Sequence, residues 1–143
     1  SNKTREIAGH FDWAYGVDRE KIAQRLSSQR PAHLAPLNIC LQVNVSGEAS
    51  KSGIAPEVAF ALAEAVAGLP GIKLRGLMAI PDPNEEPGPA FRRMREFMET
   101  LNKRGFELDT LSMGMSGDFE TAISEGATMV RVGSAIFGNR TYA

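Results

Sequence analysis

Two turns of small residues near the end of the chain have a composition that suits phosphate binding. The first runs from Gly114 to Asp118 and contains Ser116, and the second is Gly133-Ser134-Ala135. Each turn directly follows an apolar run that predicts a β-strand. Turns of this kind offer clustered backbone N–H groups and hydroxyls, which are the donors that a phosphate requires. The pair of turns therefore predicts a site for a phosphate carried on a ring.

Each of these residues also has an interpretation that involves no ligand. Ser116 is placed to be the N-cap of the helix that follows, a role that serine fills without any bound anion. Gly114 and Gly133 can be strand-end glycines that permit a tight turn. Arg131 stands in the apolar run Met129–Val132, where a buried arginine needs a carboxylate partner. From the residues alone, both interpretations stay open.

The turns belong to a chain that alternates between apolar strands and amphipathic helices. Such strict alternation implies parallel strands joined by right-handed crossovers. The second and third strands are almost continuously apolar, which indicates a sheet covered on both faces. We expect strands at Trp13–Val17, Leu37–Val45, Lys73–Ile80, Leu108–Met113 and Met129–Val132, and helices at Arg19–Ser27, Pro56–Leu69, Pro89–Lys103 and Gly117–Glu125.

Two α/β architectures with five strands and four to five helices fit this alternation. One is a partial (β/α)₈ barrel, and the other is an open, doubly wound sheet of the flavodoxin type. Barrel phosphate sites are commonly built by the loops after the last two strands, together with a short extra helix. The two turns follow the last two expected strands, and Ser134–Phe137 is a candidate for that helix. The position of the turns therefore favours the barrel.

The composition limits the classes of protein to which the chain can belong. Its 143 residues, 43% of them hydrophobic, suffice for one core, so we expect residues 1–143 to form a single domain. The formal net charge of −1 argues against a nucleic acid or an anionic membrane as a partner. The single cysteine, Cys40, excludes a disulfide framework.

Other classes are excluded by the absence of their signals. No apolar run approaches the roughly 20 residues that span a bilayer, and the first residues, SNKTREIAGH, lack the character of a signal peptide. We therefore expect a cytoplasmic protein. His10 and His33 stand alone, without a cysteine or carboxylate at the spacing of metal ligands. We expect no metal.

Three segments resemble those of a known family, the pyridoxal phosphate homeostasis proteins, which themselves resemble the barrel domain of alanine racemase. The segments are NVSGEASKSGI, LRGLMAIP and SMGMSGDFETAISEGATMVRVGSAIFG, and the resemblance extends over essentially the whole chain. It implies that residues 1–143 are the C-terminal five-eighths of a single (β/α)₈ barrel. It also implies that pyridoxal 5′-phosphate is the cofactor, held as a Schiff base to a lysine on the first strand. The first three strands, and that lysine, would be absent here.

The resemblance also assigns cofactor-binding residues. By position, the phosphate ligands of the family fall on Ser116, Gly133 and Ser134, and Ser112 would point into the barrel mouth. Arg131 would face the pyridine nitrogen. A guanidinium there keeps the nitrogen unprotonated, since a second positive charge beside it is unfavourable. The ring is then a weaker electron sink, which implies a cofactor carrier rather than an enzyme.

Lys51, in the loop GEASKSGI, is the lysine expected nearest the barrel mouth. We favour the interpretation that it is a solvated loop charge, although the resemblance places this loop beside the cofactor and implies an accessory role. Two other functions remain open. The chain could be an inactive scaffold or an engineered fragment that binds no cofactor and self-associates, or part of a pyridoxal-phosphate-dependent amino-acid racemase.

The missing strands have a physical consequence. Five strands of eight leave two sheet edges and an uncovered, largely apolar inner face. We therefore expect a homodimer, a complex with the absent N-terminal piece of the barrel, or flattening into an open sheet. The sequence does not decide between a natural fragment, a proteolytic remnant and a deliberate truncation, of which we favour a fragment or an engineered piece.

Overall fold

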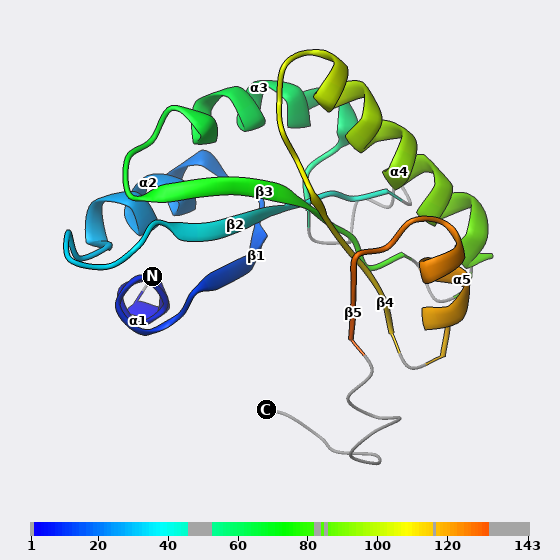
Figure 1. Ribbon diagram of the computed structural model, residues 1–143, viewed down its shortest axis with the longest axis horizontal. Coiled ribbons are helices and arrows are strands. Elements are labelled where there is room, and N and C mark those ends of the chain that lie inside the picture. Colours follow the sequence, from blue (N-terminus) through cyan, green and yellow to red (C-terminus); the bar gives the residue numbers. More distant parts are fainter. Residues whose placement is uncertain (1, 46–52, 82–83, 85, 116, 132–143) are drawn as a thin grey trace.

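The computed structural model describes residues 2–45, 53–81, 84, 86–115 and 117–131. Helices and strands alternate along these residues (Figure 1). The order is α1 (Asn2–His10), β1 (Trp13–Val17), α2 (Glu20–Gln29), β2 (Leu37–Gln42), α3 (Pro56–Ala67), β3 (Ile72–Met78), α4 (Pro87–Lys103), β4 (Thr110–Met115), α5 (Phe119–Ser124) and β5 (Met129–Arg131).

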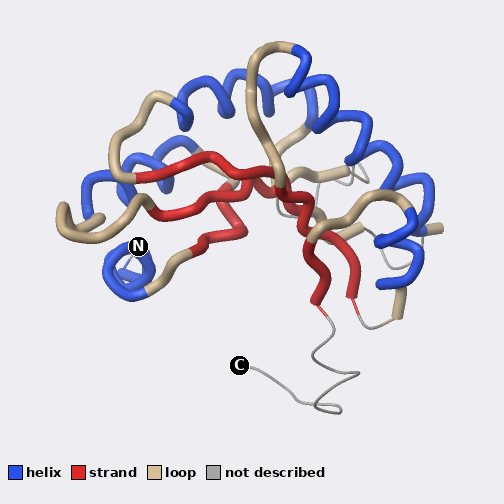
Figure 2. The backbone as a smooth tube through the Cα atoms, in the orientation of Figure 1, coloured by secondary structure: helices blue, strands red, loops and turns tan. Residues whose placement is uncertain are grey.

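The five strands form one parallel sheet in the order β1-β2-β3-β4-β5, so each strand pairs with its neighbours in sequence. The sheet curves, and the helices follow one another around its outer side (Figures 1 and 2). A doubly wound sheet instead reverses its strand order and carries helices on both faces. The observed order confirms the partial barrel and rules out the flavodoxin-type alternative.

The core lies between the sheet and the ring of helices. Alternate residues of β2, namely Leu37, Ile39 and Leu41, are fully buried and pack in one cluster with the apolar sides of the helices. Phe91 and Met94 of α4 join the same cluster. Alternation along a strand sends every second side chain to one face, so the strands present these residues outward to the helices and the intervening residues inward.

Gly76 on β3 permits a close approach between two central strands. A Cβ atom at this position would lie 1.7 Å from the carbonyl oxygen of Thr110 on β4. No side chain fits there unless the two strands separate. The backbones of β3 and β4 therefore approach closely at Gly76.

The structure differs from the sequence expectation mainly at the ends of elements. Helix α1 was not predicted, because its apolar residues are few and its pairing with α2 is what stabilises it. Arg30, at the end of α2, connects that helix to α1 and to the segments before β1 and β2, since its guanidinium donates to the carbonyl oxygens of Ala8, Phe11 and Ala35. Strand β2 ends at Gln42 rather than Val45, and Val43 makes an isolated bridge to Ile54.

Part of the inner face of the sheet carries paired polar and aromatic groups, which the expectation of a largely apolar face did not include. At the amino ends of the strands, the rings of Trp13 and Tyr15 stack with centroids 5.7 Å apart, and the guanidinium of Arg75 lies 4.9 Å from the Trp13 ring centroid. Arg75 also donates to Asn38 at 3.1 Å and to both carboxylate oxygens of Asp109, at 3.0 and 2.8 Å. Aromatic and paired charged groups occupy this end of the inner face.

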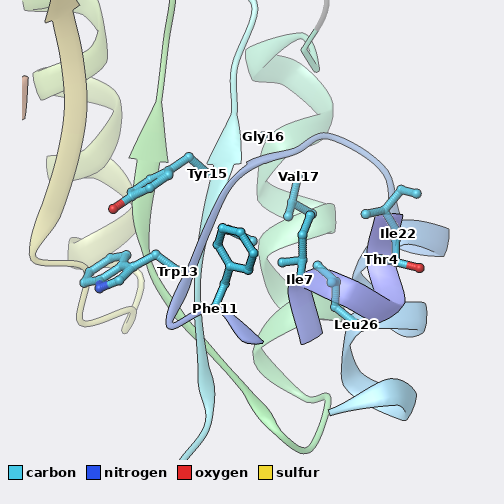
Figure 3. A pocket seen from close by; sticks show the side chains of 10 residues that line it. Thr4, Ile7, Phe11, Trp13, Tyr15, Gly16, Val17, Ile22 and Leu26 are labelled. Atoms are coloured by element: carbon cyan, nitrogen blue, oxygen red, sulfur yellow. The ribbon is translucent and has the colours of Figure 1, made fainter. Parts of the chain in front are cut away.

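An apolar hollow of about 330 Å³ lies beside the edge strand β1. Figure 3 shows that it is bordered by Phe11, Ile7 of α1, and Ile22 and Leu26 of α2. Phe11 is 55% exposed and borders this hollow. Within the described residues, β1 has a strand partner on one side only.

Candidate functional site

The carboxyl ends of the parallel strands lie together at one rim of the sheet. There the N–H of Val43 donates to the carbonyl of Met78 at 2.9 Å, and the N–H of Ala79 donates to the carbonyl of Ser112 at 3.0 Å. In α/β proteins built on parallel strands, ligands bind outside the carboxyl ends of the strands. This rim is therefore where the two small-residue turns were expected to act.

Ser112 lies on β4, one residue from two members of the core cluster. Leu111 and Met113 face the helices, so alternation places Ser112 on the inner face of the sheet. Its backbone pairs with Met78 on one side and Met129 on the other, and it is 1% exposed. Ser112 is thus a buried residue of the inner face, and its assignment to the cofactor site stays a prediction.

Gly114 lets β4 bend toward helix α5. Its φ of +101° falls in the left-handed region, which glycine adopts readily and other residues avoid. A Cβ atom here would lie 2.6 Å from the Cβ of Ala122 and 3.2 Å from a methyl of Val130. The pairing with β5 shifts register between Ser112 and Met115, as a β-bulge does. The first turn therefore requires glycine at this position.

The turn that follows β4 is closed by two hydrogen bonds between the same two residues. The N–H of Met115 donates to Oδ1 of Asp118 at 2.7 Å, and the N–H of Asp118 donates to the carbonyl of Met115 at 3.1 Å. Ser116 lies outside the described residues. The N-cap of helix α5 is Asp118, so the expectation that Ser116 caps this helix was wrong, because the helix begins two residues later than the predicted Gly117.

Helix α5 is held against α4 at its far end by charged groups. Oε2 of Glu125 lies 3.1 Å from Nη2 of Arg92, and its Oε1 lies 3.0 Å from Nη1 of Arg95. The hydrogen bond from Arg92 is the main reason that the pKa of Glu125 is lowered. Helix α5 thus packs closely against Gly114 of β4. At its end, the ion pairs of Glu125 with Arg92 and Arg95 hold it against α4.

The second turn and the lysine loop were expected to complete the site. The backbone of Arg131 belongs to β5 and pairs with Met115, whereas its side chain is outside the described part of the chain. Gly133, Ser134 and Lys51 also lie outside the described residues. These assignments therefore stay predictions, and the structure brings together only the part of the site that β4 and α5 provide.

The loop that carries Lys51 starts and ends at the carboxyl rim. The N–H of Ile54 donates to the carbonyl of Gln42 at 2.9 Å, and the N–H of Gly53 donates to Oδ2 of Asp18 at 3.3 Å. Asp18 directly follows β1, so its carboxylate links two neighbouring strand ends. The described ends of this loop therefore belong to the same rim as the turn after β4.

Sequence reasoning did not assign positioning roles to Asp118 and Glu125. Asp118 was named only as the last residue of the first turn, although an aspartate commonly accepts from a nearby backbone N–H in a turn. The three-residue spacing between Met115 and Asp118 could have indicated this hydrogen bond. The pairing of Glu125 with Arg92 and Arg95 had no such signal, because the partners are about 30 residues apart in sequence.

Cys40 lies on the inner face of β2 and is fully buried. Burial raises the pKa of its thiol to about 12, and the positive charge of Arg75 offsets only part of this effect. Since the thiolate is the reactive form, Cys40 acts as a packing residue. Within the described residues, no three His, Cys, Asp or Glu side chains gather as metal ligands, and no helix is long and apolar enough to span a bilayer.

Comparison with known proteins gives one family for nearly the whole chain. Residues 2–141 match the family described as alanine racemase, N-terminal domain. A pyridoxal phosphate homeostasis protein from Pseudomonas aeruginosa is 66% identical over 99% of this chain and 62% of its own length, and one from Vibrio cholerae is 54% identical over all of this chain and 62% of its own. The chain thus spans about 62% of the length of these curated relatives.

Solved structures support the same fold. The structure of PipY from Synechococcus elongatus with pyridoxal phosphate bound is 33% identical, with a TM-score of 0.81 over 92% of this chain and 63% of that one. Alanine racemase from Clostridium difficile matches 99% of this chain and 37% of its own, with a TM-score of 0.71 at 15% identity, which supports the fold alone. Five consecutive parallel strands with outer helices are therefore part of an alanine-racemase-type barrel.

Proposed function

This chain belongs to the alanine racemase N-terminal domain family, and we propose that it provides the phosphate-binding part of a pyridoxal 5′-phosphate carrier. The observation that carries the proposal is the turn between Met115 and Asp118, which a bulge at Gly114 and two hydrogen bonds shape at the carboxyl rim. The relatives that match the chain over 99–100% of its length are pyridoxal phosphate homeostasis proteins, a name that specifies no reaction.

The described residues fit the phosphate end of this cofactor. The buried Ser112 faces inward on β4, next to the closed turn. In the proposed site, Ser116, Gly133 and Ser134 hold the phosphate through hydroxyl and backbone N–H donors. When bound, the cofactor supplies an aldehyde and a ring that can accept electron density. Our assignment gives this chain the task of binding and orienting the phosphate.

Arg131 has a separate role in the proposal. Its place on β5, opposite Met115, puts its backbone beside the same turn. A guanidinium near the pyridine nitrogen disfavours protonation of that nitrogen, so the ring withdraws electrons less strongly. We infer from this that the protein stores or delivers the cofactor and does not catalyse a reaction on it.

We further propose that the rest of the barrel comes from an N-terminal segment that precedes residues 1–143 in the complete protein. The chain matches about 62% of the length of its relatives, and within the described residues β1 is an edge strand beside an apolar hollow. An added parallel strand would pair with β1 and cover Phe11. The lysine that binds the cofactor would belong to this segment, with Lys51 in an accessory role. The buried free thiol of Cys40 is compatible with the cytoplasm as the proposed location.

The binding experiment compares three forms of the protein. The chain is co-expressed with the segment of the Pseudomonas aeruginosa relative that precedes the match, and pyridoxal 5′-phosphate affinity is measured by equilibrium dialysis. We expect the complex to bind the cofactor and the Ser116→Ala/Ser134→Ala variant to lose binding. Ser28→Ala, on the exposed side of α2, is the control and should bind normally. Unchanged affinity in the double variant would reject the phosphate assignment.

A chemical experiment separates the remaining functions. Borohydride reduction followed by peptide mass analysis should locate the cofactor on a lysine of the added segment and leave Lys51 unmodified. Label on Lys51 would give that residue the covalent role. Absence of bound cofactor at every concentration would instead favour an inactive scaffold, and turnover of an amino acid would favour a racemase.

A further inference from the structure

One row of inward residues crosses the inner face near the carboxyl ends of three central strands. Strands β2 and β3 end at Gln42 and Met78, which pair with each other, and Met78 pairs with Ser112 on β4. The chain neighbours of each of these residues belong to the core cluster on the helix side of the sheet, so alternation turns the three side chains inward. In a parallel barrel, inward side chains lie in layers. The row is therefore the interior layer next to the carboxyl rim.

Gly16 on β1 leaves room for the side chain of Gln42. A Cβ atom at Gly16 would lie 3.3 Å from Oε1 of Gln42, so the carboxamide reaches across the inner face to β1, on the side opposite to β3. Ser112 lies on the other side of Met78 in the same row. Two strand spacings of about 4.8 Å separate the backbones of β2 and β4. The layer therefore carries polar side chains at two separate places, with a methionine between them.

The proposed function accounts for three of the four polar groups of pyridoxal 5′-phosphate. The phosphate is assigned to the small-residue turns, the ring nitrogen to Arg131 on β5, and the aldehyde to a lysine of the N-terminal segment. The fourth group is the ring hydroxyl, which stands beyond the aldehyde on the side of the ring away from the phosphate arm. A hydroxyl both donates and accepts hydrogen bonds, and a carboxamide can meet it in either role.

We propose that Gln42 is a specificity-determining residue, whose carboxamide binds the ring hydroxyl of the cofactor. This inference rests on the proposed function. Gln42 is partly buried and is the last residue of β2, so its carboxamide is presented at the rim by a strand of the sheet, and strands position ligand-binding groups more precisely than loops do. A phosphorylated ring without the hydroxyl would leave the carboxamide unpaired, which lowers affinity. Gln42 therefore selects hydroxylated ring phosphates.

The test compares pyridoxal 5′-phosphate with its 3-deoxy analogue, which lacks the ring hydroxyl, by equilibrium dialysis of the complex with the N-terminal segment. Gln42→Met keeps the length of the side chain and removes its donor and acceptor. It should bind the cofactor about tenfold more weakly than the parent and the analogue as the parent does. The control is Gln24→Met, on the outer surface of α2, where the amide of Gln24 donates to Glu20. It should bind both ligands like the parent. Equal losses for both ligands in Gln42→Met, or no loss for either, would overturn the inference.

Gly16→Ala tests the same contact without changing Gln42. The added Cβ displaces the carboxamide, since it would lie 3.3 Å from Oε1. We expect cofactor affinity to fall about threefold, analogue affinity to stay unchanged, and no further loss when Gly16→Ala is combined with Gln42→Met. Losses that simply multiply would show that the two residues act independently, against the proposal. Urea unfolding checks that each variant is folded.

The Ser116→Ala/Ser134→Ala variant reports on the proposed function separately, because both ligands carry the phosphate and both should lose affinity. If this variant binds normally while Gln42→Met still distinguishes the two ligands, the phosphate assignment fails and the role of Gln42 stands. If the serine variant loses both ligands while Gln42→Met does not distinguish them, the role of Gln42 is wrong and the proposed function stands. A parent complex that binds neither ligand would overturn both.

Discussion

The two ends of the inner face use their polar groups differently. At the amino ends of the strands, Arg75 satisfies Asp109 and Asn38 and covers the ring of Trp13, so its charged and polar groups are directed at one another. At the carboxyl ends, the polar groups hold backbone, as Asp118 does with the N–H of Met115. At the amino end, the polar side chains are therefore bonded to one another. At the carboxyl end, a polar side chain fixes the conformation of a turn.

This difference indicates where chemistry belongs in the fold. A guanidinium with two carboxylate bonds and an aromatic neighbour has few donors left for a ligand. A turn shaped by its own backbone and by one carboxylate can present main-chain N–H groups to an anion. Both ends contain charged residues, so charge alone does not identify the binding end.

The largest effect should follow from Gly114→Ala, which distorts the turn after β4 at the carboxyl end. The new Cβ would lie 2.6 Å from that of Ala122, in a backbone conformation with φ of +101°. Strain and overpacking together should lower the free energy of unfolding by about 2–4 kcal/mol and abolish cofactor binding. Urea unfolding and dialysis measure these effects.

The matched control is Gly117→Ala in the same turn. Apart from Gly117 and its chain neighbours, no atom of the described residues lies within 4 Å of the Cβ that this change adds, so stability should change by less than about 0.5 kcal/mol. Equal destabilisation by the two substitutions would show that the bulge at Gly114 is not the feature that shapes the turn.

A smaller effect is expected from Glu125→Ala, which releases α5 from α4 without changing the turn itself. Loss of the contacts with Arg92 and Arg95 should weaken cofactor binding severalfold and lower the melting temperature modestly. Glu125→Gln keeps a hydrogen-bond acceptor and should lose less. Binding that is unaffected by either change would mean that α5 needs no support from α4.

A separate prediction concerns the amino end, where Asp109→Asn should reduce stability at neutral pH and leave cofactor affinity unchanged. The hydrogen bond from Arg75 lowers the pKa of Asp109 in the folded protein. A lowered pKa stabilises the fold above the unfolded-state value of about 4, and this contribution disappears as the pH falls through the folded-state value. The stability difference between the variant and the parent should therefore shrink below about pH 4.

Urea titrations at pH 7 and at pH 3 measure this difference. A gap that widens on acidification would contradict the role given to the Arg75–Asp109 pair. A loss of cofactor affinity in Asp109→Asn would mean that the two ends of the inner face are not independent.

The smallest effect is expected for alkylation of the thiol of Cys40, which lies between the amino and carboxyl ends of the inner face. Because burial raises the pKa of its thiol to about 12, iodoacetamide at pH 8 should leave the folded protein unlabelled and should label the urea-unfolded protein fully. Mass spectrometry measures the labelling. Rapid labelling of the native protein would show that the inner face opens at β2.

Much of the fold could be predicted because its signal is local. Strand β1 was predicted at its observed bounds, and Pro56 was correctly expected to open helix α3. Helix α1 could not be predicted, since it depends on packing against α2. The polar amino end also escaped prediction, because Arg75, Asp109 and Trp13 come together only when three strands align. Period-2 alternation predicts which face a residue occupies and not which partners it finds there.

The candidate site was predictable in part for the same reason. The small residues of the first turn are adjacent in sequence, and Gly114 permits the tight bend expected of a strand-end glycine, whereas the assignment of Ser112 to the cofactor site stays a prediction. The role of Asp118 depends on a hydrogen bond back to Met115, which competed with the simpler expectation of a Ser116 cap. Gly133, Ser134 and the Arg131 side chain stay predictions from sequence.

The central claim is that the carboxyl end, and not the amino end, binds the phosphate of the cofactor. Amide NMR of the labelled chain, in complex with the unlabelled N-terminal segment, tests it directly by comparing pyridoxal 5′-phosphate with pyridoxal. We predict that the phosphate-bearing ligand shifts the amides of Met115, Gly117 and Asp118 much more than pyridoxal does, while those of Trp13 and Asn38 stay in place. Equal shifts with both ligands, or shifts confined to the amino end, would contradict the account.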